Sequence, residues 1–356
     1  MQVRERLTPA TFIGVRGGDI ISFGSGQPDL PPPPEAFRVL AGYRDFKYGL
    51  ISGSEDLREA LAPIYPGSTP DSFVITTGAS EALDLALRHI GRTCPSGRRR
   101  VLMARPYYYS YPPAVRYAGL EPVYTDTVDG CIDIEDFADK VSDCAAVLIN
   151  SPANPTGRVQ PVETLQRIEE LTRNLGIYLL ADAVYKDLIY VSETHAFAGP
   201  HVVTIDSFSK TYAMCGFRVG YLWSEDTEFV QGVIEMKTHT SMNTNILGQQ
   251  MALAALSAPP SYVEDQLVIW RERRDLIYAG LSDLGLDLWK PEGAFYVLPK
   301  VDDPYGFVSE MFERHQVITY LGEWFGAPDR VRLSYALDAD KIEAGLERIG
   351  TYLSRR

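Results

Sequence analysis

VVTIDSFSKTYAMCGFR, residues Val202–Arg218, is the stretch from which the rest of the chain can be interpreted. Its apolar beginning predicts a short buried strand, and Lys210 follows the end of that strand among hydroxyl side chains. A lysine in a partly desolvated pocket has its ammonium form disfavoured, so its amine can form a Schiff base with an aldehyde. Ser207 and Arg218 are candidates to hold a phosphate close by. Taken alone, the stretch is more typical of a solvated lysine in a serine-rich turn. The choice between this interpretation and a Schiff-base lysine therefore depends on the other segments of the chain.

The length and charge of the chain restrict its class. With 356 residues it can build a large core and is expected to divide into more than one domain. Its 45% hydrophobic and 23% charged residues are typical of a globular protein in water. The net charge of -13 argues against nucleic acid or an anionic membrane as a partner, because both bind to positive surfaces.

Cysteine usage and the amino-terminal sequence bear on the compartment. The four cysteines are far apart without a C-x-x-C pair, and H-E-x-x-H is absent, so neither a disulfide framework nor a zinc site is expected. The opening MQVRERLTPATF lacks an apolar signal region, and no apolar run approaches the roughly 18 residues of a membrane span. A cytoplasmic location is therefore expected.

Two segments near the amino terminus contain glycines that allow backbone to approach a ligand closely. In ISFGSGQPDL these are Gly24 and Gly26, and the prolines at 31–34 predict an extended linker. A Gly-Pro turn without a ligand explains this segment about equally well. Further on, Tyr48 and a glycine turn precede Ser54, a plausible N-cap of a helix. Without other information, Tyr48 is best interpreted as a core aromatic.

Short apolar strands then recur, and each delivers polar residues at its end. We predict strands at 72–76, 101–104, 145–149 and 176–181, in addition to the one at 202, with helical patterns between them. In doubly wound parallel sheets, ligands bind in the crevice at the carboxyl ends of the strands. The sequence therefore predicts an α/β fold whose polar strand ends gather at one edge of the sheet.

The residues after the first two strands suit a phosphate and a planar ring. Gly78, Ala79 and Ser80 open a helix, whose N-terminus offers free N–H groups and the positive end of the helix dipole, although an ordinary helix start is common. The second strand leads into RPYYYSYP, where aromatic side chains offer flat faces.

The next two strands end in an asparagine and an aspartate. In NSPANPTG, residues 150–157, either bond preceding proline is a candidate for the cis form, and an asparagine that only closes a turn is the alternative to a binding role for Asn154. Asp182 can keep a pyridine nitrogen protonated, which lets the ring withdraw electrons from a carbanion. A cap on a following helix is compatible with that role.

The carboxyl-terminal third predicts a second, smaller unit. A boundary is expected near residues 257–260, followed by a long amphipathic helix at 263–284 that bridges the domains. Alternating segments at 293–297, 316–320 and 331–335 suggest a small sheet, before a terminal helix from Asp338. Arg332 lies between apolar neighbours, and a buried guanidinium needs a carboxylate, supplied by either a ligand or an internal salt bridge.

As an ordered set, S-F-S-K-T-Y-A-M-C-G-F-R-V-G, N-x-P-x-N-P-T-G and R-L-S-x-A resemble the motifs of pyridoxal-phosphate-dependent aminotransferases of fold type I, class I and II. The resemblance runs from about Ile20 to the end of the chain. It implies a three-layer fold with a mostly parallel sheet in a large domain, and a smaller α+β domain built from both chain ends. The implied boundaries are residues 1–35 for the arm and part of the small domain, 36–257 for the large domain, and 258–356 for the rest of the small domain.

The resemblance also implies residue roles around pyridoxal 5'-phosphate and an obligate homodimer with shared sites. Lys210 would bind the cofactor and act as catalytic base, with Asp182 and Tyr185 as the other catalytic residues. The remaining implied contacts are Tyr108 with the ring face, Asn154 and Tyr185 with the phenolic oxygen, Gly78, Ala79, Ser80, Ser207, Arg218 and the partner subunit's Tyr48 with the phosphate, and Gly26, Asn154 and Arg332 with the substrate.

The implied reaction is transfer of an amino group between an amino acid and a 2-oxo acid. Elimination, replacement or ring closure on the same carbanion is the enzymatic alternative, within amino-acid biosynthesis. A cofactor-sensing module of a transcription regulator is a third hypothesis, but the resemblance begins too early to leave room for a DNA-binding domain. The sequence departs from the family at Ala183, at Leu321 and in a short arm, which weakens any inference about the substrate.

Overall fold

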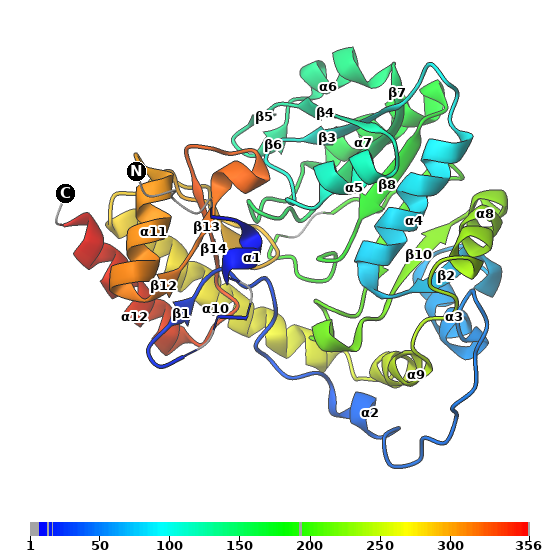
Figure 1. The fold of residues 1–356 in the computed structure, drawn as a ribbon, viewed down its shortest axis with the longest axis horizontal. Coiled ribbons are helices and arrows are strands. Elements are labelled where there is room, and N and C mark those ends of the chain that lie inside the picture. The colour runs from blue at the N-terminus through cyan, green and yellow to red at the C-terminus, as the bar shows by residue number, and fades with distance from the viewer. Residues whose placement is uncertain (1–6, 13, 16, 192–193, 355–356) are drawn as a thin grey trace, which may run out of the picture.

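The computed structural model describes residues 7–12, 14–15, 17–191 and 194–354, in which a large α/β unit and a small α+β unit lie side by side (Figure 1). The predicted arm lies partly outside these ranges, because residues 1–6 are not among them. The central sheet of the large unit consists, in chain order, of β2 (Phe73–Thr76), β3 (Arg100–Ala104), β4 (Glu121–Thr125), β7 (Cys144–Asn150), β8 (Tyr178–Asp182), β9 (Val202–Ser207) and β10 (Gly220–Ser224).

The strand order across this sheet is β2-β10-β9-β8-β7-β3-β4, and β10 is the single antiparallel member. The mostly parallel sheet that the sequence predicted is therefore confirmed. The central strands β7 and β8 are mostly apolar, as expected for parallel strands with both faces covered, and β9 is fully buried although it contains Thr204, Asp206 and Ser207. A hairpin of β5 (Thr127–Val128) and β6 (Cys131–Ile132) lies beside the sheet.

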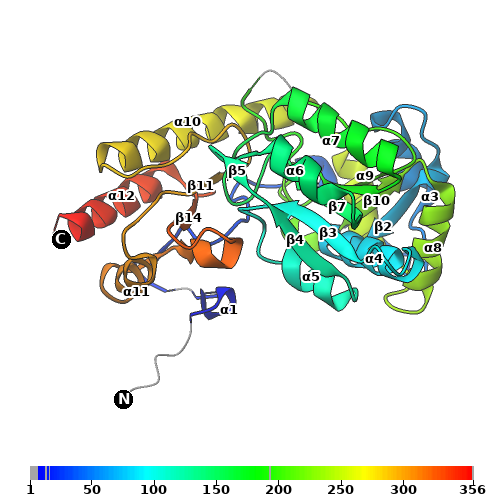
Figure 2. The same cartoon turned by 90° about the horizontal axis from the view of Figure 1, so that it is seen from above.

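Alternate side chains of each strand enter different cores, because successive residues point to opposite faces. Val147 and Leu179 pack with the helices on one face, whereas Leu148 and Leu180 pack with those on the other. Figure 2 shows the resulting three layers. The helices of the large unit are α2 (Pro34–Phe37), α3 (Glu55–Leu61), α4 (Gly78–Thr93), α5 (Tyr111–Tyr117), α6 (Ile134–Val141), α7 (Val162–Leu175), α8 (Thr227–Thr238) and α9 (Ile246–Ala255), with short 3-10 helices at Ala62–Ile64, Pro70–Ser72 and Cys215–Phe217.

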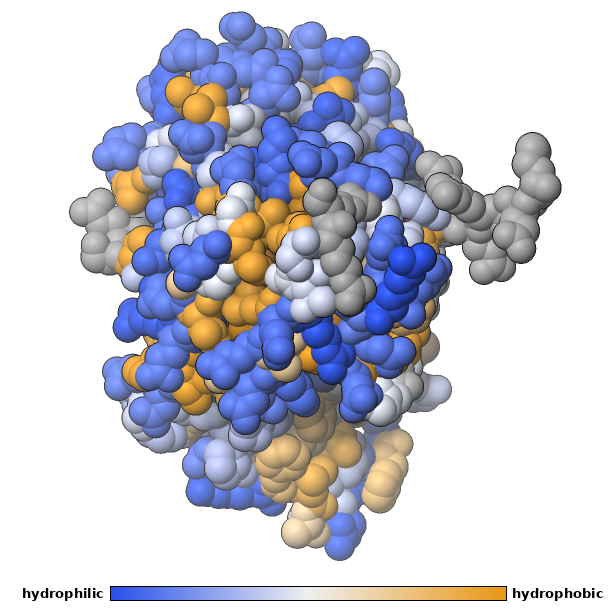
Figure 3. All heavy atoms as spheres, turned by 90° about the vertical axis from the view of Figure 1, so that its left-hand side faces the viewer, coloured by the Kyte–Doolittle hydropathy of each residue, from blue (hydrophilic) through white to orange (hydrophobic). Residues whose placement is uncertain are grey.

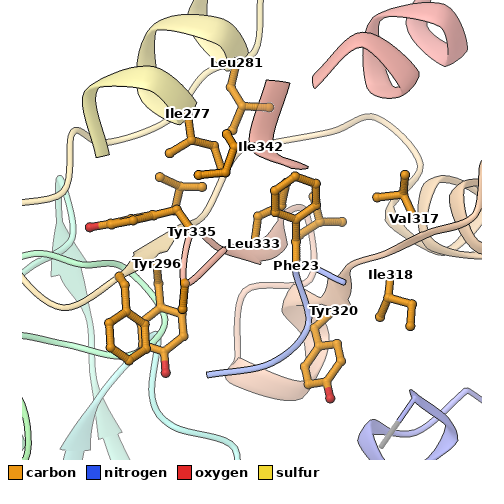
Figure 4. Packing of buried hydrophobic residues seen from close by; sticks show 14 of the residues in the cluster. Phe23, Ile277, Leu281, Tyr296, Val317, Ile318, Tyr320, Leu333, Tyr335 and Ile342 are labelled. Atoms are coloured by element: carbon orange, nitrogen blue, oxygen red, sulfur yellow. The ribbon is translucent and has the colours of Figure 1, made fainter. Parts of the chain in front are cut away.

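Both ends of the chain build the small unit. Strand β1 (Ile21–Ser22) pairs in parallel with β12 (Val317–Ile318), and Phe23 next to β1 is fully buried among side chains of the carboxyl-terminal segments (Figure 4). Its other elements are α1 (Pro9–Phe12), α10 (Ser261–Asp283), β11 (Tyr296–Val297), α11 (Pro304–His315), β13 (Tyr320–Leu321), the 3-10 helix Gly322–Phe325, β14 (Val331–Ser334) and α12 (Ala339–Leu353).

The hydrophobic clusters place the two sides of the linker near residue 35 in different surroundings. Ala36 packs in a cluster of the large unit, whereas Phe12 and Phe23 share a cluster with side chains of residues 270–352 and with Val184, Tyr185 and Leu188. Helix α10 begins beside the large unit and then enters the small one. Its buried Arg273 pairs with Asp29 at 2.6 Å, so the helix also holds the chain where it crosses between the units.

Four local predictions need correction. The strand predicted at 176–181 begins at Tyr178, because Gly176 adopts a left-handed conformation that ends α7. In the described residues no helix connects β8 to β9, so Asp182 caps none. The segment 316–320 is not one strand of the small sheet: β12 pairs with β1, whereas β13 joins β14 and β11. Ser54 does precede α3, but its side chain makes no capping bond.

Most of the face that the small unit presents is hydrophilic, with apolar groups mainly in a central band (Figure 3). None of the helices in the described residues has the length and apolar character that crossing a bilayer requires.

Replacing Phe23 with alanine should lower the free energy of unfolding by about 3 to 5 kcal/mol, because it leaves a cavity in the core of the small unit. Denaturant titration measures this change. The exposed Val268 on α10 provides the control, since Val268→Ala should change stability by less than about 0.5 kcal/mol. A loss below about 1 kcal/mol in Phe23→Ala would show that this core tolerates the cavity and that the amino-terminal strand is not anchored by it.

Candidate active site

A cavity of about 660 Å³ opens at the carboxyl ends of the parallel strands, between the large and small units. This is the edge of the sheet at which the sequence predicted a site. The predicted site residues that line it are Gly26, Ala79, Ser80, Tyr108, Asn154, Asp182, Tyr185, Ser207, Lys210, Arg218 and Arg332. Gly78 and Tyr48 do not line it.

Lys210 stands in the turn after β9, where the strand has ended and the chain reverses. Its Nζ donates a hydrogen bond of 2.5 Å to the carbonyl oxygen of Gly26, which comes from the amino-terminal segment. Burial lowers the pKa of Lys210, and the nearby positive charge of Arg332 acts in the same direction. The amine is therefore easier to deprotonate than an ordinary lysine, as the sequence predicted.

Asp182 ends β8 and is the buried carboxylate of the cavity. Its Oδ2 accepts a 2.5 Å hydrogen bond from the hydroxyl of Tyr111, and its Oδ1 accepts one of 3.3 Å from the backbone N–H of Val184. Burial raises the pKa of Asp182 to about 6, although the bond from Tyr111 lowers it. This carboxyl group is therefore about half ionised at pH 6 and mostly ionised at neutral pH.

A cradle for an anion lies at the amino terminus of α4. The first turn of this helix contributes Ala79 and Ser80, and Arg218 and Ser207 approach from the sheet side. Gly78 has φ of +73°, and a Cβ there would lie 2.5 Å from Arg218 Nη2, so only glycine lets the guanidinium come this close. The role of Gly78 in the structure is therefore to make room for Arg218. Free N–H groups, the helix dipole and a guanidinium together favour a phosphate.

Arg332 on β14 is buried but pairs with no carboxylate among the described residues. It donates to Asn154 Oδ1 at 3.0 Å and to the carbonyl oxygen of Gly24 at 2.5 Å, while its Nε has no partner. Three aromatic rings surround the guanidinium, those of Tyr296, Tyr320 and Phe325, at 4.7 to 4.9 Å. The internal salt bridge that the sequence left open is not made within these residues, which leaves Arg332 available to an anionic ligand.

The aromatic residues of the site were only partly predicted. Tyr108 lines the cavity next to Tyr111, with ring centroids 5.4 Å apart, and the Tyr185 hydroxyl bonds to that of Tyr296 at 2.8 Å. No role was predicted from the sequence for Tyr111 or Tyr296, which also line the cavity. Tyr111 closes the RPYYYSYP motif at the start of α5, which was the available signal, whereas Tyr296 sits in an unremarkable alternating segment.

Tyr48 does not occupy the core position that the sequence alone favoured. Its side chain is 84% exposed, between Phe46 and Leu50, which are also exposed. Both prolines of NSPANPTG follow cis bonds, and the backbone N–H of Asn154 bonds to Asn150 Oδ1 at 2.9 Å. Asn154 is thereby held at the cavity wall.

The fold and the cavity, which holds a buried amine and a buried carboxylate, are those of the pyridoxal-phosphate fold type I class of enzymes. The family model for aminotransferases of class I and II matches residues 18–349, and the chain belongs to this family. It is a pyridoxal-phosphate-dependent aminotransferase, which transfers an amino group between an amino acid and a 2-oxo acid.

Similar proteins support this assignment. The chain is 32% identical to an aspartate aminotransferase of Thermotoga maritima, covering 96% of this chain and 93% of the relative. It is 31% identical to a probable aspartate/prephenate aminotransferase of Aquifex aeolicus, with 96% and 92% covered. A solved aspartate aminotransferase of Thermus thermophilus, a double mutant, superposes with a TM-score of 0.88 at 31% identity over 94% and 91% of the chains. An aromatic aminotransferase of Pyrococcus horikoshii gives 0.87 at 29% identity over 96% and 97%.

The raised pKa of Asp182 predicts a pH-dependent stability of the cofactor-free protein. Because the folded pKa of about 6 lies above the ordinary 3.8, Asp182 stabilises the fold at low pH, and this contribution is lost as pH rises from about 4 through 6. Asp182→Asn should therefore gain stability relative to the wild type over this range, by up to about 3 kcal/mol for a shift of roughly two units. Urea unfolding at several pH values measures the difference. A difference that is constant with pH would contradict the raised pKa.

Proposed function

We propose that the cavity binds pyridoxal 5'-phosphate, with Lys210 on its aldehyde carbon, Asp182 on its ring nitrogen and the α4 cradle on its phosphate. The observation that carries the proposal is that one cavity joins a lysine of lowered pKa, a buried carboxylate and an anion cradle. When bound, the cofactor supplies an electron-withdrawing ring that stabilises negative charge on the substrate's Cα. The unpartnered Nε of Arg332 and the space that Gly78 leaves for Arg218 support the fit.

The individual roles follow from where the side chains stand. Lys210 would take the proton from Cα and return it, which suits an amine whose pKa burial has lowered. Asp182 would hold the proton of the ring nitrogen in place. We assign the other cofactor contacts to Tyr108, Asn154, Tyr185, Gly78, Ala79, Ser80, Ser207 and Arg218, and substrate binding to Gly26, Asn154 and Arg332.

Arg332 is the residue proposed to orient the substrate. A planar guanidinium binds a carboxylate in a bidentate manner, and the rings around it exclude water and strengthen that interaction. With the α-carboxylate held at Arg332, the amino group is directed toward the side of the cavity where Lys210 stands. This orientation keeps the bond to the α-hydrogen within reach of the lysine.

We further propose a homodimer with shared active sites. The segment around α2 exposes Phe37, Leu40, Phe46, Tyr48 and Leu50, and Figure 1 shows it as a long loop at the edge of the molecule. Contiguous exposed apolar side chains of this kind mark interaction surfaces. In a symmetric dimer, the same surface on both subunits would bring Tyr48 to the phosphate cradle of the other subunit.

We also propose a cytoplasmic location and a role in amino-acid biosynthesis. The four cysteines are unpaired in the structure, and Cys215 lines the cavity, which suits a reducing compartment. The names of the relatives favour amino transfer over elimination or ring closure.

Lys210→Ala should abolish amino transfer from amino acids to 2-oxo acids, with a loss of at least about a thousandfold in kcat. Part of the cofactor should remain bound through the phosphate cradle. The assay follows formation of the new amino acid and also measures ammonia and cyclised products, which would reveal the alternative chemistry. The exposed Lys300, paired with Asp329, gives the control Lys300→Ala, which should keep full activity. Full activity in Lys210→Ala would refute the assignment.

Shared sites predict complementation between two inactive variants. Tyr48→Ala and Lys210→Ala homodimers should each be nearly inactive, but subunit exchange should form mixed dimers with one intact site. An equal mixture should then recover about a quarter of the wild-type activity, since half of the dimers are mixed and each has one working site. If exchange is shown by mass spectrometry and no activity returns, Tyr48 does not serve the partner subunit.

A further inference from the structure

Behind the anion cradle lies a buried ion pair that the proposed function does not use. Lys237, near the end of α8, is fully buried, and its Nζ lies 3.0 and 3.2 Å from the two carboxylate oxygens of Glu81 on the first turn of α4. The same Nζ donates to Ser241 Oγ at 2.9 Å. Burying an ammonium group costs desolvation free energy unless ionic and hydrogen-bond partners offset it. The burial of Lys237 therefore needs an explanation.

Glu81 is hydrogen-bonded to the segment that leads into the cradle. Its carboxylate accepts from the backbone N–H of Thr77 and from the hydroxyl of Ser241. On the other side of the same residue, Arg218 Nη2 donates to the carbonyl oxygen of Thr77 at 3.4 Å. Both backbone polar groups of Thr77 are therefore hydrogen-bonded, the N–H to Glu81 and the carbonyl oxygen to Arg218. Thr77 directly precedes Gly78 and the amides of the cradle.

The negative charge of Glu81 lies on the first turn of α4, where we propose that a phosphate binds. Burial would raise the pKa of Glu81, but hydrogen bonds from Ser241 and Thr77 and the charge of Lys237 together lower it, so the group is ionised at neutral pH. A carboxylate on the first turn of α4 repels a phosphate bound at that helix terminus. Lys237 cancels this charge. Arg218, which among the described residues donates only to carbonyl oxygens, then keeps its positive charge for the ligand.

We propose that Glu81 and Lys237 are positioning residues for the cofactor phosphate: Glu81 anchors Thr77 and the amino terminus of α4, and Lys237 neutralises the anchor. This inference rests on the proposed binding of pyridoxal 5'-phosphate and concerns its phosphate alone. The anchoring role of Glu81 and the neutralising role of Lys237 can be tested separately.

The neutralisation test compares pyridoxal 5'-phosphate with pyridoxal, which lacks the phosphate. Purified enzyme is stripped of cofactor and titrated with each compound by absorbance. Lys237→Met should weaken binding of pyridoxal 5'-phosphate by about tenfold or more, because Glu81 is left uncompensated near a dianion, whereas pyridoxal should change by less than about twofold. The double variant Lys237→Met with Glu81→Gln should return the affinity to within about threefold of the wild type. Lys140→Met, which removes the exposed pair with Asp136, is the control and should change neither affinity.

The anchoring test uses two neutral pairs, so it remains decisive if Lys237→Met alone does not fold. Both double variants contain Lys237→Met, combined with either Glu81→Gln or Glu81→Ala. The glutamine oxygen can still accept from Thr77 N–H and the alanine cannot, so the alanine variant should bind pyridoxal 5'-phosphate more weakly by about fivefold, with pyridoxal unaffected.

Equal losses for the two compounds in Lys237→Met would reduce the pair to a structural role and overturn the neutralisation part. Equal affinities of the two double variants would overturn the anchoring part. If the wild-type enzyme bound neither compound, the proposed function itself would fail. If the wild type bound pyridoxal 5'-phosphate and the variants bound it equally well, only the roles of Glu81 and Lys237 would fail.

Discussion

Two groups that ordinarily carry opposite charges, the amine of Lys210 and the carboxyl of Asp182, are buried in one cavity without touching each other. Among the residues that the structure describes, neither forms an ion pair: the lysine donates to a backbone carbonyl and the aspartate accepts from Tyr111. Burial then shifts both pKa values toward the neutral forms. The rest of the site depends on this separation, because a direct salt bridge would satisfy both groups and leave no reason to bind a charged heterocycle between them.

The separation is a consequence of the parallel sheet. Strands β8 and β9 are neighbours that run in the same direction, so their carboxyl ends deliver Asp182 and the turn with Lys210 to the same edge. Because helices cover both faces, the strand interiors are mostly apolar, and most polar residues of β7, β8 and β9 lie at the carboxyl ends. The same rule puts the first turn of α4, which follows β2, at this edge.

The small unit completes the cavity from chain segments that are far apart in sequence. Gly24 and Gly26 lie near the amino terminus and Arg332 near the carboxyl terminus, yet Arg332 bonds directly to Gly24 and Lys210 to Gly26. The pairing of β1 with β12 and the burial of Phe23 hold these segments together. The proposed orientation of the substrate and the stability of the small unit would therefore depend on one set of contacts. Glu81 and Lys237, which are also far apart in sequence, are in contact behind the anion cradle.

The sequence by itself determined β2, β3, β7, β8 and β9 and the polar residues at their ends, because apolar runs and helix-start chemistry are local properties that a single segment carries. It did not predict β4 or β10. It also identified most of the residues that converge, although not Tyr111 or Tyr296, since parallel strands with covered faces must gather their ends. Only the tertiary structure decided how those residues are paired. Tyr111 reaches Asp182, Asn154 bonds to Arg332, and Gly78 makes room for Arg218, and all three depend on distances between segments that no local pattern encodes. The burial of Lys237 has the same origin, because a lysine in an amphipathic helix is satisfied inside a protein only when another element brings it a carboxylate.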